Sequence, residues 1–337
     1  MYMNSNKLFF IMILGFSTLM AISSNSWLGC WIGLEINLLS FIPLISNSNN
    51  LLCSEAALKY FLIQTMASSN LLMMIFLNYI LYNFFFKNNI IMLMINSALL
   101  MKMGSAPFHF WFVSTLEGMT WMNCFIMMTW QKITPMILLS YYYNKKFLII
   151  IIILTCIIGV IGGMNQKSLR KLMGFSSINN MAWMMSAMMM SENLWNFYFL
   201  MYSFLTMIMC YIFFNMNLYF INQIFYLNFK KQIKFFIFLN LLSLGGLPPF
   251  LGFLSKWIIL NNMIYNNMIF IVYFLIMTSL LNLFFYIRMC YSSMMLNHLN
   301  LKWFNLNLKM NFYFILMKLS MLSIISLVIS TFLFYIN

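Results

Sequence analysis

The sequence is short of charge. Lysine, arginine, aspartate and glutamate together make up 7% of the 337 residues, aspartate is absent, and only four glutamates are present. A soluble domain carries roughly 25% charged residues because its surface must face water. Hydrophobic residues make up 64% of the chain, and the mean hydropathy is +0.90. Most of the surface is therefore expected to face lipid, as in an integral membrane protein.

Clustered ligands for metals or redox groups are also lacking. The chain contains six cysteines and two histidines, and they lie far apart, without a CxxC pair. Disulfides, zinc, iron–sulfur clusters and haem therefore have no support in the sequence, and we expect this chain to bind no cofactor or metal. These residues are Cys30, Cys53, Cys124, Cys156, Cys210, Cys290, His109 and His298.

The formal net charge of +14 does not indicate a nucleic-acid partner. The basic residues are scattered singly or in twos and threes between apolar runs, and no basic arm is present. The excess of lysine and arginine in the loops on one side of a membrane protein accounts for this pattern better.

Residue usage indicates which genome encodes the chain. The chain has 37 methionines and 37 phenylalanines, which AT-rich coding and a code that reads AUA as methionine would produce together, as in animal mitochondria. A methionine-rich apolar core is the alternative, since methionine fills irregular gaps. No arginine-rich presequence is seen, as expected for a chain made inside the organelle.

Apolar runs predict the fold class. A spanning helix needs about 20 apolar residues, and runs of this kind predict an all-α polytopic protein with about eleven transmembrane helices in a single domain, 1–337. Segments 216–233 and 294–310 are expected along the membrane interface. The predicted spans are 6–24, 26–46, 54–84, 89–115, 120–143, 146–164, 173–191, 193–215, 234–263, 267–292 and 311–336.

Eleven spans put the two termini on opposite sides of the membrane, and loop charges orient them. Nine basic residues fall on the side of the N-terminus and three on the other, so the N-terminus is expected on the matrix or cytoplasmic side. The nine are Lys7, Lys167, Arg170, Lys171, Lys230, Lys231, Lys234, Lys302 and Lys309, and the three are Lys87, Lys145 and Lys146.

Two spans carry helix-breaking residues, Gly-Ser-Ala-Pro at 104–107 and Gly-Gly-Leu-Pro-Pro at 245–249. Backbone groups freed at such breaks survive in a bilayer only inside protein or beside a wet cavity. Pro107 and Pro248 are 141 residues apart, and the first and sixth spans start 140 residues apart. This register predicts two inverted five-helix repeats, 6–143 and 146–292, each broken in its fourth helix, with 311–336 as a closing helix.

Four ionisable residues fall deep within spans: Glu35, Lys102, Lys132 and Lys256. Each costs on the order of 3 kcal/mol at the bilayer centre, a cost tolerated only inside the bundle, beside a partner or in contact with water. The set contains one carboxylate and three lysines, so its positive charge is not balanced, and burial disfavours a lysine's charged form. We therefore expect a proton path in which Glu35 is closest to Lys102, while ion pairs that merely orient helices remain the alternative.

Weaker candidates surround this set. His109, beside the first break, is either a proton relay or a core histidine whose hydrogen bonds are satisfied. Glu55 and Lys59 stand at i,i+4 spacing, which favours an interfacial ion pair. Arg288 and Lys318 lie near the ends of spans, where long basic side chains reach toward water.

Several segments resemble the subunit 2 family of the NADH dehydrogenase of mitochondrial respiratory complex I, and the insect members most. The resemblance runs in order along nearly the whole chain. The segments are 27–41 (WLGCWIGLEINLLSF), 55–61 (EAALKYF), 106–111 (APFHFW), 129–132 (TWQK), 168–171 (SLRK) and 243–250 (SLGGLPPF).

The resemblance implies an antiporter-like fold without the three leading helices of bacterial relatives, and a proton axis through Glu35, Lys102, Lys132 and Lys256. It also implies a mitochondrial inner-membrane subunit that couples quinone reduction elsewhere in the complex to proton movement. NADH, FMN, iron–sulfur clusters and ubiquinone would then be bound by other subunits. Expected partners are subunits 4 and 4L, accessory subunits and lipids such as cardiolipin.

Two other functions share these features. A stand-alone cation/proton antiporter would have the same fold, but it normally needs intramembrane acids, and this chain has one deep glutamate. A purely structural membrane subunit, which holds its neighbours in register, is the third possibility. Mutation of the deep lysines in an assembled complex would separate it from a proton path.

Overall fold

A computed structural model describes residues 5–47, 50–80, 88–226, 231–295, 317–318 and 320–323. Within them the secondary structure is helical, apart from one isolated bridge between Ser168 and Phe220. The chain forms two compact units, 1–154 and 155–337, and the division falls inside one helix. Each unit is described by itself. The expected fold class, all-α, is confirmed.

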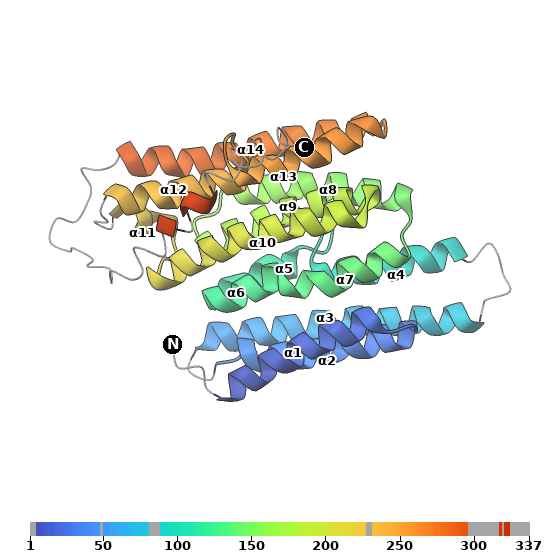
Figure 1. Ribbon diagram of the computed structural model, residues 1–337. Helices are drawn as coiled ribbons and strands as arrows, with labels where there is room; N and C mark the ends of the chain where they lie inside the picture. Colours follow the sequence, from blue (N-terminus) through green and yellow to red (C-terminus); the bar gives the residue numbers. More distant parts are fainter. Residues whose placement is uncertain are drawn as a thin grey trace. The chain divides into compact units, whose positions relative to one another are not determined.

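Unit 1 begins with three long helices that pack side by side, α1 (Ser5–Ser23), α2 (Trp27–Ile45) and α3 (Leu51–Ile80) (Figure 1). The Ser26 side chain starts α2 by accepting a hydrogen bond from the Gly29 backbone N–H, 3.2 Å away. Four shorter helices follow: α4 (Asn88–Met103), α5 (Phe110–Gly118), α6 (Trp121–Met128) and α7 (Trp130–Tyr141).

The helix α8 (Lys145–Met164) leads from unit 1 into unit 2. Unit 2 continues with α9 (Leu169–Met190), α10 (Glu192–Asn215), the short α11 (Ile221–Tyr226), α12 (Lys231–Gly245), α13 (Leu251–Tyr265) and α14 (Ile269–Met295). Nearly all of α9 is buried, which makes it the central helix of this unit. The Ser323 hydroxyl donates to the Asn240 side-chain oxygen at 3.0 Å, so the short segment near 320 packs on α12.

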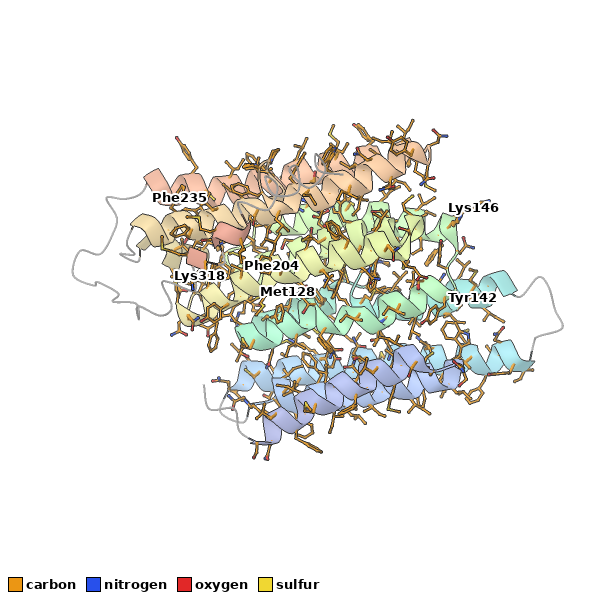
Figure 2. The ribbon with its side chains drawn as sticks, viewed as in Figure 1. Met128, Tyr142, Lys146, Phe204, Phe235 and Lys318 are labelled. Carbon is orange, nitrogen blue, oxygen red and sulfur yellow. The ribbon has the colours of Figure 1, made fainter. Side chains whose placement is uncertain are left out.

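In the part of the chain that the structure describes, six helices are long and apolar enough to cross a membrane: α1, α2, α3, α8, α10 and α14. Large hydrophobic side chains project outward from them and from their shorter neighbours, and Phe235 on α12, labelled in Figure 2, is half exposed. An apolar outer surface of this kind suits lipid rather than water. The scarcity of charge in the sequence and the exposed surface therefore agree.

Helices occupy the described part of all ten ranges predicted before residue 295; where both ends are described they differ by at most four residues, and 81–84 of the third range lie outside the described residues. The closing helix, 311–336, lies outside the described residues except for 317–318 and 320–323, and so does the interfacial segment 294–310 with His298, apart from 294–295 at the end of α14. Among the residues used for orientation, Lys87, Lys230, Lys302 and Lys309 are also outside. The count of eleven spans, the inverted repeats and the orientation stay predictions.

Candidate functional site

The fourth predicted span is broken where the sequence indicates. The helix α4 ends at Met103, Gly104 follows with φ of +71°, and α5 begins at Phe110. This left-handed conformation suits glycine, since a side chain there would crowd the backbone. A β-carbon at Gly104 would also lie 2.6 Å from Cβ of Phe112, so the turn and the start of α5 pack too closely for any larger residue.

The carbonyl groups freed by this break find donors within unit 1. The indole N–H of Trp111 donates to the Met101 carbonyl at 3.1 Å, and the Gln64 side-chain amide donates to the Lys102 carbonyl at 3.0 Å. The backbone N–H and the hydroxyl of Ser105 both donate to the Leu100 carbonyl at 3.2 Å. The break is thus held by neutral groups, which leaves the ammonium of Lys102 for other interactions.

Lys102 occupies the last turn of α4 and is 6% exposed. The Glu35 carboxylate on α2 lies within electrostatic reach of its ammonium, and that Glu35 is the acid nearest to Lys102 stays a prediction. One carboxylate oxygen of Glu35, Oε1, is buried and accepts no hydrogen bond. The C-terminal end of a helix favours a positive charge, so the end of α4 and Glu35 both stabilise Lys102 as a cation.

A group of polar residues that the sequence analysis did not single out lies beside this pair. The amide of Gln131 donates to the Asn37 side-chain oxygen at 2.9 Å, and the Tyr60 hydroxyl lies 3.4 Å from the other side of the same amide, Oε1. Tyr60 is also within electrostatic reach of Glu35. For Asn37 and Gln131 the available signal was their position in mid-span, two residues from Glu35 and one from Lys132.

A second interruption, which the sequence analysis did not predict, divides the fifth span. The helix α6 ends at Met128, Thr129 has φ of −118° and ψ of −72°, and α7 begins at Trp130. The Thr129 hydroxyl donates to the Phe125 carbonyl at 2.7 Å, a contact that bends helices. Pro135, inside α7, removes one more backbone donor.

Lys132 is the third residue of α7 and is 1% exposed. Its ammonium lies 5.1 Å from the centre of the Phe112 ring, a favourable cation–π arrangement. The same Phe112 packs against Gly104 at the first break, so one aromatic ring touches both the Lys132 ammonium and the turn that follows Lys102. Sitting in the first turn, Lys132 is at the helix end that disfavours a positive charge.

The ninth predicted span is broken between α12 and α13, again as the sequence indicates. Gly246 has φ of +86°, and the Lys256 side chain on α13 folds back over it. Its ammonium donates to the Gly245 carbonyl at 2.8 Å, which is the last carbonyl of α12. The ammonium also lies 5.7 Å from the centre of the Trp183 ring. At this break the lysine itself supplies the hydrogen bond to the free carbonyl at the end of α12.

His109 stands at the start of α5 and is 7% exposed. Its Nδ1 atom is 3.2 Å from the Pro107 carbonyl, and its ring lies 4.1 Å from that of Phe110. These local contacts fix the ring on the loop of the first break. The structure thus gathers Glu35, Lys102, Lys132 and His109 in unit 1, whereas Lys256 belongs to unit 2, and one continuous line through all of them stays a prediction.

The described residues hold no group of three or more histidine, cysteine, aspartate or glutamate side chains suited to a metal. Glu55 and Lys59 form the expected i,i+4 ion pair at 3.9 Å, with both side chains more than half exposed. A pair of this kind contributes little to stability. The expectation that the chain binds no cofactor stays a prediction.

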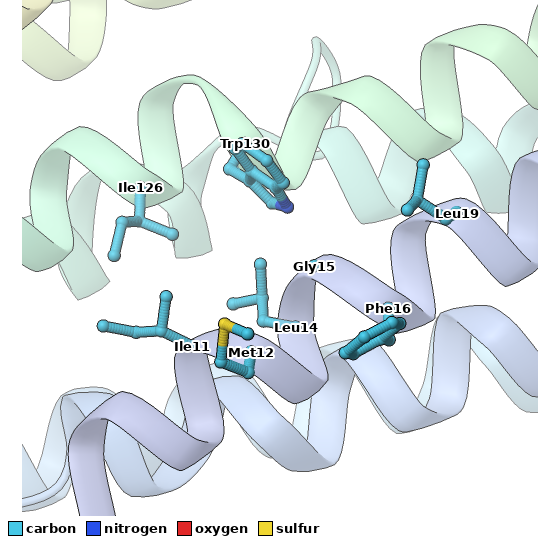
Figure 3. A pocket seen from close by; sticks show the side chains of 8 residues that line it. All are labelled: Ile11, Met12, Leu14, Gly15, Phe16, Leu19, Ile126 and Trp130. Carbon is cyan, nitrogen blue, oxygen red and sulfur yellow. The ribbon is translucent and has the colours of Figure 1, made fainter. Parts of the chain in front are cut away.

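An apolar groove of about 370 Å³ lies on unit 1 between α1 and the helices α6 and α7 (Figure 3). Trp130 and Ile126 face α1 across it, and Gly15 leaves open space at its floor. Its lining contains no titratable group. The groove is therefore separate from the lysines, although Trp130 is only two residues from Lys132.

Comparison with known proteins gives matches along most of the chain. Residues 24–282 match the family model described as NADH:quinone oxidoreductase/Mrp antiporter, TM. NADH-ubiquinone oxidoreductase chain 2 of Anopheles gambiae is 51% identical over 318 residues, which cover 91% of this chain and 92% of that protein. The protein of the same name from Locusta migratoria is 44% identical over 332 residues, 97% of each chain.

Solved structures show the same fold at low identity. A chain of respiratory complex I from Thermus thermophilus superposes with a TM-score of 0.81 at 18% identity, covering 96% of this chain and 79% of that one. A chain of the Mrp complex from Dietzia gives a TM-score of 0.75 at 14% identity, covering 83% and 59%. The fold is thus that of antiporter-like membrane subunits.

Proposed function

This chain belongs to the NADH-ubiquinone oxidoreductase chain 2 family, and from that membership we propose that it is a proton-translocating subunit in the membrane arm of complex I. As such it is part of an enzyme that oxidises NADH and reduces ubiquinone, and it carries out no redox step itself. We assign NADH, FMN, the iron–sulfur clusters and ubiquinone to other subunits of the complex, as the family resemblance implies.

One observation supports proton conduction above the others: each of the three broken helices carries a buried lysine at its break. Lys102 lies in the last turn of α4, Lys132 lies in the first turn of α7, and Lys256 bonds to the last carbonyl of α12. Broken helices in transporters mark the place where ions are bound in the middle of the membrane. A lysine buried among apolar side chains is stable only with partners or water, and both are expected at a proton path.

The proton path runs through titratable groups whose surroundings differ. The ends of α4 and α12 favour a positive charge on Lys102 and Lys256, and Glu35 adds a negative charge beside Lys102. Lys132 lacks a favourable helix end. A change that moves Glu35 away from Lys102 would release a proton there, and the charge would pass toward Lys132. His109 on the neighbouring loop is a further proton carrier in this scheme.

The finer architecture is part of the proposal. Eleven spans place the N-terminus in the matrix and the C-terminus in the intermembrane space. Repeats 6–143 and 146–292 are related by inversion, and 311–336 closes the bundle. A left-handed glycine lies at the breaks of both the fourth and the ninth spans, Gly104 and Gly246, which supports two equivalent repeats. Neighbours in the inner mitochondrial membrane are subunits 4 and 4L, accessory subunits and cardiolipin.

The test replaces Lys132 by methionine in the assembled complex. Methionine keeps most of the bulk of the side chain and removes the titratable group, so assembly should persist while protons moved per electron fall. Lys59→Met is the matched control, because Lys59 is exposed and pairs only weakly with Glu55. Proton movement is measured with NADH and a quinone in proteoliposomes. An unchanged ratio in Lys132→Met would leave the chain a structural subunit.

A further inference from the structure

The core of unit 2 contains buried polar groups that no protein atom satisfies. Asn179, in the middle of α9, is fully buried, and neither its side-chain nitrogen nor its oxygen has a hydrogen-bond partner. The same is true of the indole nitrogen of Trp183, one turn further along α9, and of the side-chain oxygen of Asn282 on α14. Buried groups of this kind are normally bonded to protein or to ordered water.

Contacts between α8, α9 and α14 place these groups at one level. Cys156 on α8 hydrogen-bonds to the Thr278 side chain on α14. Seven residues further along both helices, a β-carbon at Gly163 would lie 3.4 Å from the Phe285 ring. The two helices therefore run in register, and Asn282 falls between these two levels.

Asn179 falls at the same intermediate level. A β-carbon at Gly159 would lie 2.8 Å from the backbone nitrogen of Asn179, so α8 and α9 approach closely there. Asn179 and Asn282 thus reach the space between the three helices at one height, both with unsatisfied polar atoms. The two unsatisfied atoms of Asn179 and the unsatisfied oxygen of Asn282 make the site polar enough to hold water.

Polar groups continue from this level in both directions. Toward the middle of the unit, Trp183 lies under the ammonium of Lys256, 5.7 Å from ring centre to nitrogen. Toward the end of α14, the buried Tyr286 hydroxyl lies near the Ser176 side chain, with no hydrogen bond of ordinary geometry. Two residues beyond, the exposed Arg288 donates to the Met164 carbonyl, the last residue of α8.

We propose that a chamber between α8, α9 and α14 binds ordered water, and that this water connects Lys256 with the end of unit 2 marked by Arg288. The ligand is water or its protonated form, held by Asn179 and Asn282. The role given to this water, proton supply to Lys256, rests on the proposed function. The chamber itself rests only on the unsatisfied amides and the helix register.

The experiment compares two neighbouring asparagines in the assembled complex. Asn179→Leu keeps the number and branching of the side-chain heavy atoms and removes two polar atoms without protein partners, so thermal stability should hold or rise. The proton-to-electron ratio should fall toward that of Lys256→Met. Asn180→Leu is the control, because Asn180 accepts a hydrogen bond from the Tyr198 hydroxyl at 3.0 Å. It should lower stability and leave the ratio of the assembled enzyme unchanged.

The outcomes separate this inference from the proposed function. If Lys256→Met reduces the ratio and Asn179→Leu does not, the chamber is wrong and the function stands. If Lys256→Met has no effect, the role of Lys256 in the proposed function fails. If Asn179→Leu destabilises the complex as Asn180→Leu does, the amide is a structural group. A map of the whole complex that resolves waters should show density between Asn179 and Asn282, and direct protein bonds to both amides would also overturn the proposal.

Discussion

Replacing Gly246 by alanine tests the contact between the α12–α13 break and Lys256. With φ of +86°, Gly246 adopts a conformation that costs an L-residue about 1–2 kcal/mol. The new β-carbon would lie 3.0 Å from the Lys256 nitrogen and 3.1 Å from its Cδ. The flexible side chain can move away, so the overlap itself costs little. That movement, however, breaks the 2.8 Å bond to the Gly245 carbonyl.

A hydrogen bond from a charged group is worth about 1.5–3 kcal/mol. Together with the backbone cost, Gly246→Ala should therefore destabilise the subunit by about 3–5 kcal/mol. Gly245→Ala is the neighbouring control, because its β-carbon would meet the Tyr286 ring at 3.4 Å, an ordinary contact. The control should change stability by less than about 1 kcal/mol.

Thermal inactivation of the assembled complex, followed by NADH-driven proton movement, measures the difference between the two variants. In a Lys256→Met background there is no bond to the Gly245 carbonyl left to break. The penalty of Gly246→Ala should then shrink to the backbone cost of about 1–2 kcal/mol. Equal inactivation temperatures for Gly246→Ala and Gly245→Ala would refute the reasoning. A penalty that stays the same without Lys256 would refute the contribution of the lysine bond.

Two further predictions concern packing and access. Gly33→Ala should lower the stability of the assembled complex by about 1–3 kcal/mol, since its β-carbon would lie 2.7–2.8 Å from Ala21 on α1, whereas Gly15→Ala meets nothing within 4 Å and should be neutral or slightly stabilising in the same thermal assay. A membrane-permeant maleimide should modify Cys290 before the other five cysteines, because Cys290 alone is not fully buried; mass spectrometry that finds Cys156 labelled first would contradict the packing of α8.

Much of the helical framework could be predicted because hydropathy and helix-breaking residues act locally. Runs of apolar residues determine where the helices lie. A glycine followed within a few residues by proline ends α4 and α12, whichever helices pack against them. The burial of the deep lysines inside the protein could be predicted from the free-energy cost of a charged side chain in lipid. These signals need no knowledge of which helix lies beside which.

The interruption at Thr129 could not be predicted in the same way, because threonine is tolerated inside helices. Its effect comes from a side-chain bond to Phe125, combined with Pro135 one and a half turns later. The contacts of Gln64 and Gln131 depend on the register between helices, to which distant parts of the chain contribute. The same holds for Asn179 and Asn282, whose sequence neighbours do not show that their amides lack partners.

The broken helices also bear on how the chain enters a membrane. At 1.5 Å per residue, the 16 residues of α4 extend about 24 Å and the eight of α6 about 12 Å, while the hydrocarbon layer is about 30 Å thick. Neither piece can cross alone, and α4 carries a lysine in its last turn. These segments must therefore insert together with the helices that continue them, α5 and α7. They also need neighbours such as α3, whose Gln64 donates a hydrogen bond to the Lys102 carbonyl. The interrupted helices therefore depend on their neighbours for membrane insertion, whereas an unbroken helix such as α8 is long enough to insert by itself.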